Sequence, residues 1–388
     1  MNFLSKYIMA AVMLLLSACG ATSAPVSDGV LEPGDCGVTA TADAEVTGAG
    51  PFRVGFRSVE TVYQPPGVED ERTIRVNIWY PSQDEEGNVG RYINLYPDAE
   101  VMTDASLAPP LSNCGYPLLV YSHGHQGFGG TAAHMMRAFA SHGWVAIAPD
   151  HTGNLITDNL DPRPIWMYYV RSLDISHSLD VIETLPDEDP LANSVATDRV
   201  VMSGHSFGSM TVWASAGASF DMDRVAGHCT SHEGEAGCSP AQLEVFAGGL
   251  RDDRVVAAIP LTNPYTHAWF GDTGYESVDI PFLHMTGSED DVGAPEQWDR
   301  LQDSDVDLTW IELEGGCHET FAMGTLFCPT PEDGGEYLDE AEGFRIVNAY
   351  ALSLARHHVL GDDRPAILEI LNGDASLSPV VTFRRNHK

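Results

Sequence analysis

The chain has 388 residues, of which 43% are hydrophobic, so it is long enough to bury the core of a large globular domain. Its formal net charge of −36 at pH 7 would repel nucleic acid and anionic membrane surfaces, which excludes them as partners. So acidic a surface fits an exported protein from a salty habitat, or it reflects genome composition, and both explanations stay open.

The first 19 residues have the pattern of a bacterial signal peptide. Lys6 precedes an apolar stretch, 8–16, that is shorter than the roughly 20 residues needed to span a bilayer. Leu-Ser-Ala-Cys-Gly at 16–20 resembles the lipobox of bacterial lipoproteins. The resemblance implies that Cys19 becomes the lipid-carrying first residue of a protein anchored in the cell envelope. An ordinary signal peptide, followed by secretion, is the alternative.

Six further cysteines are an even number, which in an oxidising compartment indicates disulfides. Closeness in the sequence suggests the pairs Cys229–Cys238 and Cys317–Cys328, and elimination leaves Cys36–Cys114. Free buried thiols are the alternative.

Residues 20–50 are rich in small residues and show no periodicity, which predicts a flexible tether before a single catalytic domain over 51–388. Alternating segments at 52–56 and 73–81 are typical of antiparallel strands. Residues 82–113 are polar and contain proline, which favours a loop.

Buried strands and helices then alternate along the chain. Apolar runs predict strands at 117–122, 144–149, 255–260, 281–285 and 308–313, and helices are expected at 131–142, 165–185 and 337–357. This order predicts an α/β fold with a mostly parallel central sheet and helices on both faces. Residues 219–250 break the pattern with cysteines, glycines and acids, so we interpret them as a lid-like insertion over the site.

Ser206 stands in Gly-His-Ser-Phe-Gly at 204–208, after an apolar run and before residues with helical spacing. This is the pattern of a nucleophile elbow, in which the serine occupies the tip of a strained strand-to-helix turn. Gly204 and Gly208 would let neighbouring backbone pass close to the serine. The backbone N–H of Phe207 would point to where an oxyanion forms. A serine that merely caps the helix is the alternative.

A serine nucleophile needs a base and an orienting acid, which in this architecture follow in the order serine, acid, histidine. Asp290 and Asp291 lie in a loop after the strand predicted at 281–285, and His318 lies in a loop after the strand at 308–313. Both loops are at carboxyl ends of strands, where open α/β sheets place their ligands.

Six motifs carry a resemblance to known enzymes over about residues 52–357. They are Ile-Trp-Tyr-Pro at 78–81, Ser-His-Gly-His at 122–125, Ala-Pro-Asp-His at 148–151, the elbow at 204–208, the loop at 287–295, and Gly-Gly-Cys-His at 315–318. The chain resembles α/β-hydrolases of the dienelactone hydrolase, platelet-activating-factor acetylhydrolase and cutinase group. The resemblance implies an α/β-hydrolase fold in which Ser206 is the nucleophile, His318 is the general base, and the backbone N–H groups of Phe207 and His125 form the oxyanion hole.

The same resemblance implies Asp291 as the acid, because cutinase-like enzymes place it four residues after the loop glycine and four before the proline. Asp290 is the alternative, since other hydrolases place the acid three residues after the glycine. Dienelactone hydrolases use a cysteine nucleophile, so Ser206 argues against dienelactone as substrate.

The sequence therefore predicts an exported serine hydrolase that cleaves carboxylic esters of small molecules through an acyl-enzyme. A lipid or polyester hydrolase of the acetylhydrolase or cutinase type is the first alternative. We expect no cofactor and no metal, and membrane contact only through the N-terminal anchor. A peptidase, thioesterase or acyltransferase on the same triad, or a non-catalytic envelope binding module, are the alternatives. The oligomeric state stays open.

Overall fold

The computed structural model describes residues 45–158, 160, 162–231, 237–262, 266–290, 294–330 and 335–386. The predicted signal peptide, Cys19, Cys36 and most of the predicted tether lie outside these residues. The last residues of that tether, 45–50, pack against the folded domain, because Val46 is buried and the Gly50 N–H donates to Ser141 Oγ at 3.0 Å. The domain therefore begins before residue 51.

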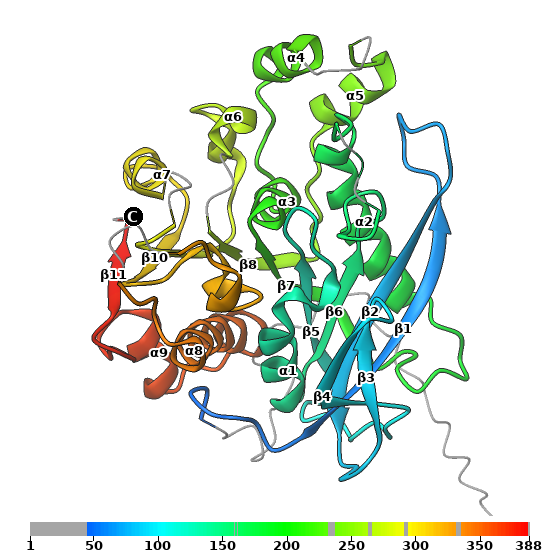
Figure 1. Cartoon of the computed structure of the whole chain (residues 1–388), viewed down its shortest axis with the longest axis vertical. Helices are drawn as coiled ribbons and strands as arrows, with labels where there is room; N and C mark the ends of the chain where they lie inside the picture. The colour runs from blue at the N-terminus through cyan, green and yellow to red at the C-terminus, as the bar shows by residue number, and fades with distance from the viewer. Residues whose placement is uncertain are drawn as a thin grey trace, which may run out of the picture. The chain divides into compact units, whose positions relative to one another are not determined.

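Eleven strands of the described chain form one mixed sheet (Figure 1). They are β1 (Arg53–Tyr63), β2 (Arg72–Ser82), β3 (Asn88–Tyr92), β4 (Tyr96–Thr103), β5 (Tyr116–Ser122), β6 (Val145–Asp150), β7 (Val195–His205), β8 (Val255–Leu261), β9 (Phe282–Gly287), β10 (Leu308–Leu313) and β11 (Val381–Arg385). Their order is β11-β10-β9-β8-β7-β5-β6-β2-β1-β4-β3. Strands β5 to β10 run parallel, whereas β1 and β2 pair antiparallel and β2 joins β6 antiparallel. The predicted α/β fold with a mostly parallel centre is confirmed.

Helices cover both faces of this sheet. Their bounds are α1 (Ala133–Ser141), α2 (Met167–Glu183), α3 (Phe207–Ser215), α4 (Met222–Ser231), α5 (Pro240–Gly248), α6 (His267–Phe270), α7 (Ala294–Leu301), α8 (Glu340–Leu360) and α9 (Pro365–Leu371). One apolar core lies under α2, α3 and α7, and a second lies under α1, α8 and α9. Fully buried strands such as β5 therefore have apolar side chains on both faces, as expected for a covered parallel sheet.

The prediction of a loop over 82–113 was wrong, because this segment contains the β3–β4 hairpin. Few of its residues are buried, so the segment carries little apolar signal. It is held at the sheet edge through the pairing of β4 with β1, where Val101 lies opposite Val54 and is fully buried. A polar segment here becomes a strand because a neighbour supplies its hydrogen bonds.

The described part of the insertion predicted at 219–250 contains two helices, α4 and α5, which lie at the top of Figure 1 beyond α2 and α3. A disulfide links Cys229 on α4 to Cys238, which lies just before α5. Ser239 begins α5 with a capping box, in which its side chain accepts from the Gln242 N–H. None of the helices in the described ranges is both long and apolar enough to cross a membrane.

Candidate active site

Ser206 occupies the tight turn between β7 and α3, with φ 54° and ψ −116°. A positive φ is uncommon for a residue other than glycine and costs about 1–3 kcal/mol. The end of β8 holds the turn, because the Ser206 N–H donates to the Leu261 carbonyl at 3.0 Å and lies 3.2 Å from Thr262 Oγ1. The structure thus has the predicted strand, strained turn and helix, with a half-buried serine at the tip.

Three glycines bring the neighbouring segments close to Ser206. A Cβ on Gly208 would overlap the carbonyl oxygen of Ser122 at the end of β5. A Cβ on Gly204 would lie 2.5 Å from the carbonyl oxygen of Gly208. A Cβ on Gly124 would lie 3.5 Å from the Cβ of Ser206. The loop after β5, which carries the predicted oxyanion donor, therefore packs against the elbow.

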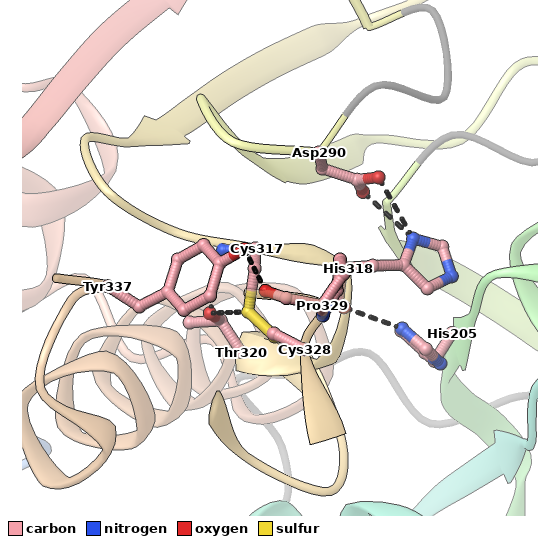
Figure 2. The surroundings of a disulfide bond; sticks show 8 residues. All are labelled: His205, Asp290, Cys317, His318, Thr320, Cys328, Pro329 and Tyr337. Carbon is pink, nitrogen blue, oxygen red and sulfur yellow. Dashed lines mark hydrogen bonds and ion pairs between the residues drawn. A yellow bond between two sulfur atoms is a disulfide. The ribbon is translucent and has the colours of Figure 1, made fainter. Parts of the chain in front are cut away.

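His318 opens a short 3₁₀ helix, η5 (His318–Phe321), that follows β10. Its Nδ1 lies 3.0 Å from each carboxylate oxygen of Asp290, in the loop after β9 (Figure 2). The neutral imidazole that donates from Nδ1 has its lone pair on Nε2, which is the form that a general base requires. Asp290, the alternative acid, is thus the carboxylate that contacts His318. Asp291, the preferred acid, lies outside the described residues.

The His318 loop is closed by the predicted disulfide Cys317–Cys328 (Figure 2). The Cys317 N–H donates to Thr320 Oγ1 at 2.9 Å, which fixes the turn that leads into His318. Both disulfides predicted from closeness in the sequence are confirmed. Cys114 is also disulfide-bonded, and its predicted partner, Cys36, lies outside the described residues.

His205 is a buried neighbour of this pair, and its contact with the His318 loop was not predicted. Its Nε2 lies 2.9 Å from the His318 carbonyl oxygen, and the two rings are 4.7 Å apart (Figure 2). Burial lowers the pKa of His205 to about 3, so it stays neutral. Its bond to the His318 carbonyl supports the histidine loop.

One group of described side chains offers the ligands of a metal site. The ligand atoms of His205, His318 and Glu319 lie within 4.8 Å of one another. In the arrangement described, His318 bonds to Asp290 through Nδ1, and His205 bonds to a backbone carbonyl through Nε2. These bonds fit an acid–base pair of His318 and Asp290 that is supported by the buried His205.

The predicted oxyanion donors belong to two adjacent segments. His125 lies in the turn after β5, and its Nδ1 accepts from Asn154 Nδ2 at 2.7 Å. Phe207 is the first residue of α3, and its ring lies against two guanidinium groups, 4.3 Å from Arg163 and 4.6 Å from Arg171.

A second serine–histidine–aspartate set lies beneath these segments. Ser122 Oγ is 2.9 Å from His151 Nε2, and His151 Nδ1 is 2.8 Å from Asp174 Oδ2. All three residues have no exposed surface, so no substrate reaches them. Ser122 and His151 stand in motifs that the sequence singles out, whereas Asp174 lies within the predicted helix and was missed. An aspartate among the apolar positions of that helix was the available signal.

A comparison with models of protein families found no match, and neither did a comparison with curated proteins. Solved structures do resemble the chain. One is a ferulic acid esterase from Streptomyces cinnamoneus, which is 20% identical, with 88% of this chain and 98% of that chain covered and a TM-score of 0.59. This likeness shows that the chain shares its fold with that esterase.

Proposed function

We propose that the chain is an exported serine hydrolase with the α/β-hydrolase fold, which cleaves carboxylic esters through an acyl-enzyme. The observation that carries the proposal is the strained backbone of Ser206 at the strand-to-helix turn. The His318–Asp290 pair, which follows the parallel strands β9 and β10, supports it. Asp290 takes the place of Asp291 as acid because its carboxylate bonds to the histidine.

In the proposed reaction, Ser206 Oγ attacks the ester carbonyl carbon while His318 Nε2 takes the hydroxyl proton. The backbone N–H groups of Phe207 and His125 bind the oxyanion of the tetrahedral intermediate. His318 then gives the proton to the leaving alcohol, and the acyl group stays on Ser206. Water, deprotonated by His318, releases the acid by the same steps in reverse. Asp290 keeps the proton on Nδ1 and stabilises the imidazolium.

The test is hydrolysis of p-nitrophenyl esters, from acetate to palmitate, by the chain that lacks residues 1–19. We expect turnover that disappears in Ser206→Ala and persists in Ser219→Ala, a control serine after the far end of α3. A fluorophosphonate should label the wild type and the control, but not Ser206→Ala. A folded protein that neither turns over esters nor takes the label would favour the binding-module alternative.

Aromatic side chains beside the nucleophile favour esters of aromatic acids as a narrower substrate class. The Tyr168 ring meets the Phe207 ring edge-on at 5.1 Å and stacks on Trp269 at 4.1 Å. The faces of these rings contact one another and neighbouring guanidinium groups, and Tyr168 is the half-buried member, whose exposed part would contact a planar acyl group. The structurally similar enzyme is named as an esterase of ferulic acid, which is an aromatic acid.

Competition between methyl ferulate and ethyl butyrate tests this narrower class. We expect a higher kcat/KM for the ferulate, and a selective loss of that preference in Tyr168→Ala. A preference for long aliphatic chains would instead support the lipid or polyester alternative.

Export and lipid attachment are part of the proposal. Disulfides at Cys229–Cys238 and Cys317–Cys328 fit an oxidising compartment. Mass spectrometry of the protein from the membrane fraction should find Cys19 acylated at the new N-terminus. An unmodified N-terminus in the secreted fraction would support the ordinary signal peptide.

A further inference from the structure

Arg171, on α2, contacts both segments that carry the proposed oxyanion donors. Its side chain is buried, with 1% of the residue exposed. Its Nη2 group donates to the carbonyl oxygen of His123, in the loop that leads to His125. The same guanidinium lies 4.6 Å from the centre of the Phe207 ring. A single planar group thus contacts both donor segments.

A second branch reaches His125 through Asn154. Arg171 Nη1 donates to Asn154 Oδ1 at 2.8 Å, and the amide of Asn154 lies 2.7 Å from His125 Nδ1. The guanidinium therefore holds the loop after β5 both through its backbone and through a side chain. Since the positions of the donor N–H groups decide how well they meet an oxyanion, these bonds bear directly on the proposed catalysis.

The buried serine–histidine–aspartate set fixes Arg171 in turn. His151 donates from Nδ1 to Asp174, so its Nε2 accepts from the Ser122 hydroxyl. The lone pairs of Ser122 Oγ then face Arg171 Nη2, which donates to them at 3.0 Å. Asp174 is itself anchored by Arg72, whose Nε and Nη2 lie 2.7 and 2.8 Å from its two oxygens. The set has the connectivity of a triad, and its serine oxygen accepts a hydrogen bond from the guanidinium.

Arg171 also brings a buried positive charge to this position. No carboxylate of the described residues forms an ion pair with it. Burial lowers the pKa of its guanidinium well below the usual value, and the nearby Asp174 opposes this effect. Arginine starts so far above neutral pH that it keeps its proton in proteins. Burying a cation without a paired anion is costly, which is more easily explained at a functional site than in a purely structural core.

From these contacts we infer that Arg171 is the positioning residue of the oxyanion hole, setting the His125 and Phe207 segments at the separation that an oxyanion requires. The inference rests on the proposed ester hydrolysis. Arg171 acts through the two segments and touches no substrate.

The test compares Arg171→Met and Arg171→Lys with the wild type on the best p-nitrophenyl ester. Removal of an oxyanion donor lowers kcat by about 100-fold or more, and we expect Arg171→Met to approach a loss of about 100-fold, with KM changed less than about two-fold. Arg171→Lys should remain well below the wild type, because an ammonium lacks the planar fork that meets His123, Ser122 and Asn154 together. Arg356→Met is the matched control, since Arg356 on α8 is also buried but pairs at 2.8 Å with Asp362, which follows that helix. It should lose stability and keep its kcat.

An aryl boronate, which forms a tetrahedral anion on the serine, separates positioning from general stability. Its inhibition constant should rise in Arg171→Met by the same factor as kcat/KM falls. An unchanged constant, or a kcat that falls only as far as the folded fraction falls, would overturn the inference. If Arg171→Met does not fold, Asn154→Ala cuts the branch to His125 and leaves Arg171 in place. The same two measurements apply to it, with a loss of about 10-fold expected. A wild type without Ser206-dependent turnover would instead refute the proposed function.

Discussion

The Nδ1 atom of His318 lies equally far, 3.0 Å, from both carboxylate oxygens of Asp290. The Asp290 side chain is 1% exposed, whereas that of His318 is 27% exposed, so the acid is shielded and part of the imidazole is accessible. A shielded carboxylate interacts strongly with an imidazolium because little water screens the two charges.

Asp290→Asn should therefore abolish most of the activity. An amide in this place favours the wrong histidine tautomer, and in a comparable triad such a change lowers kcat by about four orders of magnitude. Asp291→Asn is the matched control and should keep wild-type kcat. Steady-state kinetics on a p-nitrophenyl ester decide between them, and the reverse pattern would restore Asp291 as the acid.

The Cys317–Cys328 disulfide closes a loop with a sequence separation of 11 residues. Replacing both cysteines by serine should lower the free energy of unfolding by about 3 kcal/mol, and should also lower kcat because His318 loses a fixed neighbour. The double replacement at Cys229 and Cys238, with a separation of 9, should cost about as much stability.

Thermal unfolding and the rate of fluorophosphonate labelling measure the two effects. We expect slow labelling only when the disulfide beside His318 is removed. Equal labelling rates in the two variants would mean that this disulfide stabilises the fold without steadying the base.

Gly208→Ala should prevent stable folding of the elbow. The new methyl group would meet the Ser122 carbonyl, which belongs to the backbone of a central strand and has no room to move. Gly227→Ala, within α4, meets nothing within 4 Å and should stabilise the protein by about 0.5–1 kcal/mol. Denaturant unfolding measures the free energy of unfolding of both variants and so tests both expectations. A soluble, active Gly208→Ala protein would show that the elbow is less tightly packed than described.

Stability should fall as the pH drops below about 6.5, because buried histidines must stay neutral in the folded chain. Burial lowers the pKa of each of six histidines, to about 4 for His134, His284 and His358, to about 3 for His151 and His205, and well below the usual value for His123. Below about pH 6.5 the unfolded chain binds more protons at these positions, so acid favours unfolding. Burial raises the pKa of Asp150 to about 6 and also raises that of Glu319, which acts in the opposite direction.

The six histidines with a lowered pKa outnumber the two carboxyls with a raised pKa, which sets the expected sign. Carboxyls with a lowered pKa, such as Asp174 and Asp252, act in the same direction as the histidines. Melting temperatures measured from pH 8 to pH 4 at constant ionic strength should fall most steeply between pH 6 and 4. His284→Gln should reduce this slope. A constant melting temperature over that range would contradict the assignment of these histidines as neutral.

The central strands, the elbow and the histidine loop were predictable, because long apolar runs and glycine-flanked turns are local signals. The hairpin β3–β4 and the strand β11 were not, since their residues are mostly half-buried or exposed and their pairing depends on distant strands. The sequence could not decide between Asp290 and Asp291 as the acid either. Adjacent residues point in different directions, and only the path of the loop after β9 decides which one reaches His318.

The buried support of the oxyanion segments was missed for a related reason. Arg171 and Asp174 lie three residues apart on α2, so they face the same side of the helix. Their partners come from β2, from the end of β5 and from the loop after β6, which only the fold brings together. Polar residues in a predicted buried helix are the signal to follow in such a chain.

The last strand, β11, covers the open side of β10 through antiparallel pairing from Leu313↔Val381 to Thr309↔Arg385. Without it, the apolar strand β10 would present unpaired N–H and C=O groups along a nearly fully buried sequence, Leu-Thr-Trp-Ile-Glu-Leu. Such an edge is a template for intermolecular sheet formation, and arginines on an edge strand discourage it. Arg384 and Arg385 on β11 would therefore disfavour pairing with a second chain. A chain shortened at residue 380 should form insoluble assemblies, even though every proposed catalytic residue would still be present.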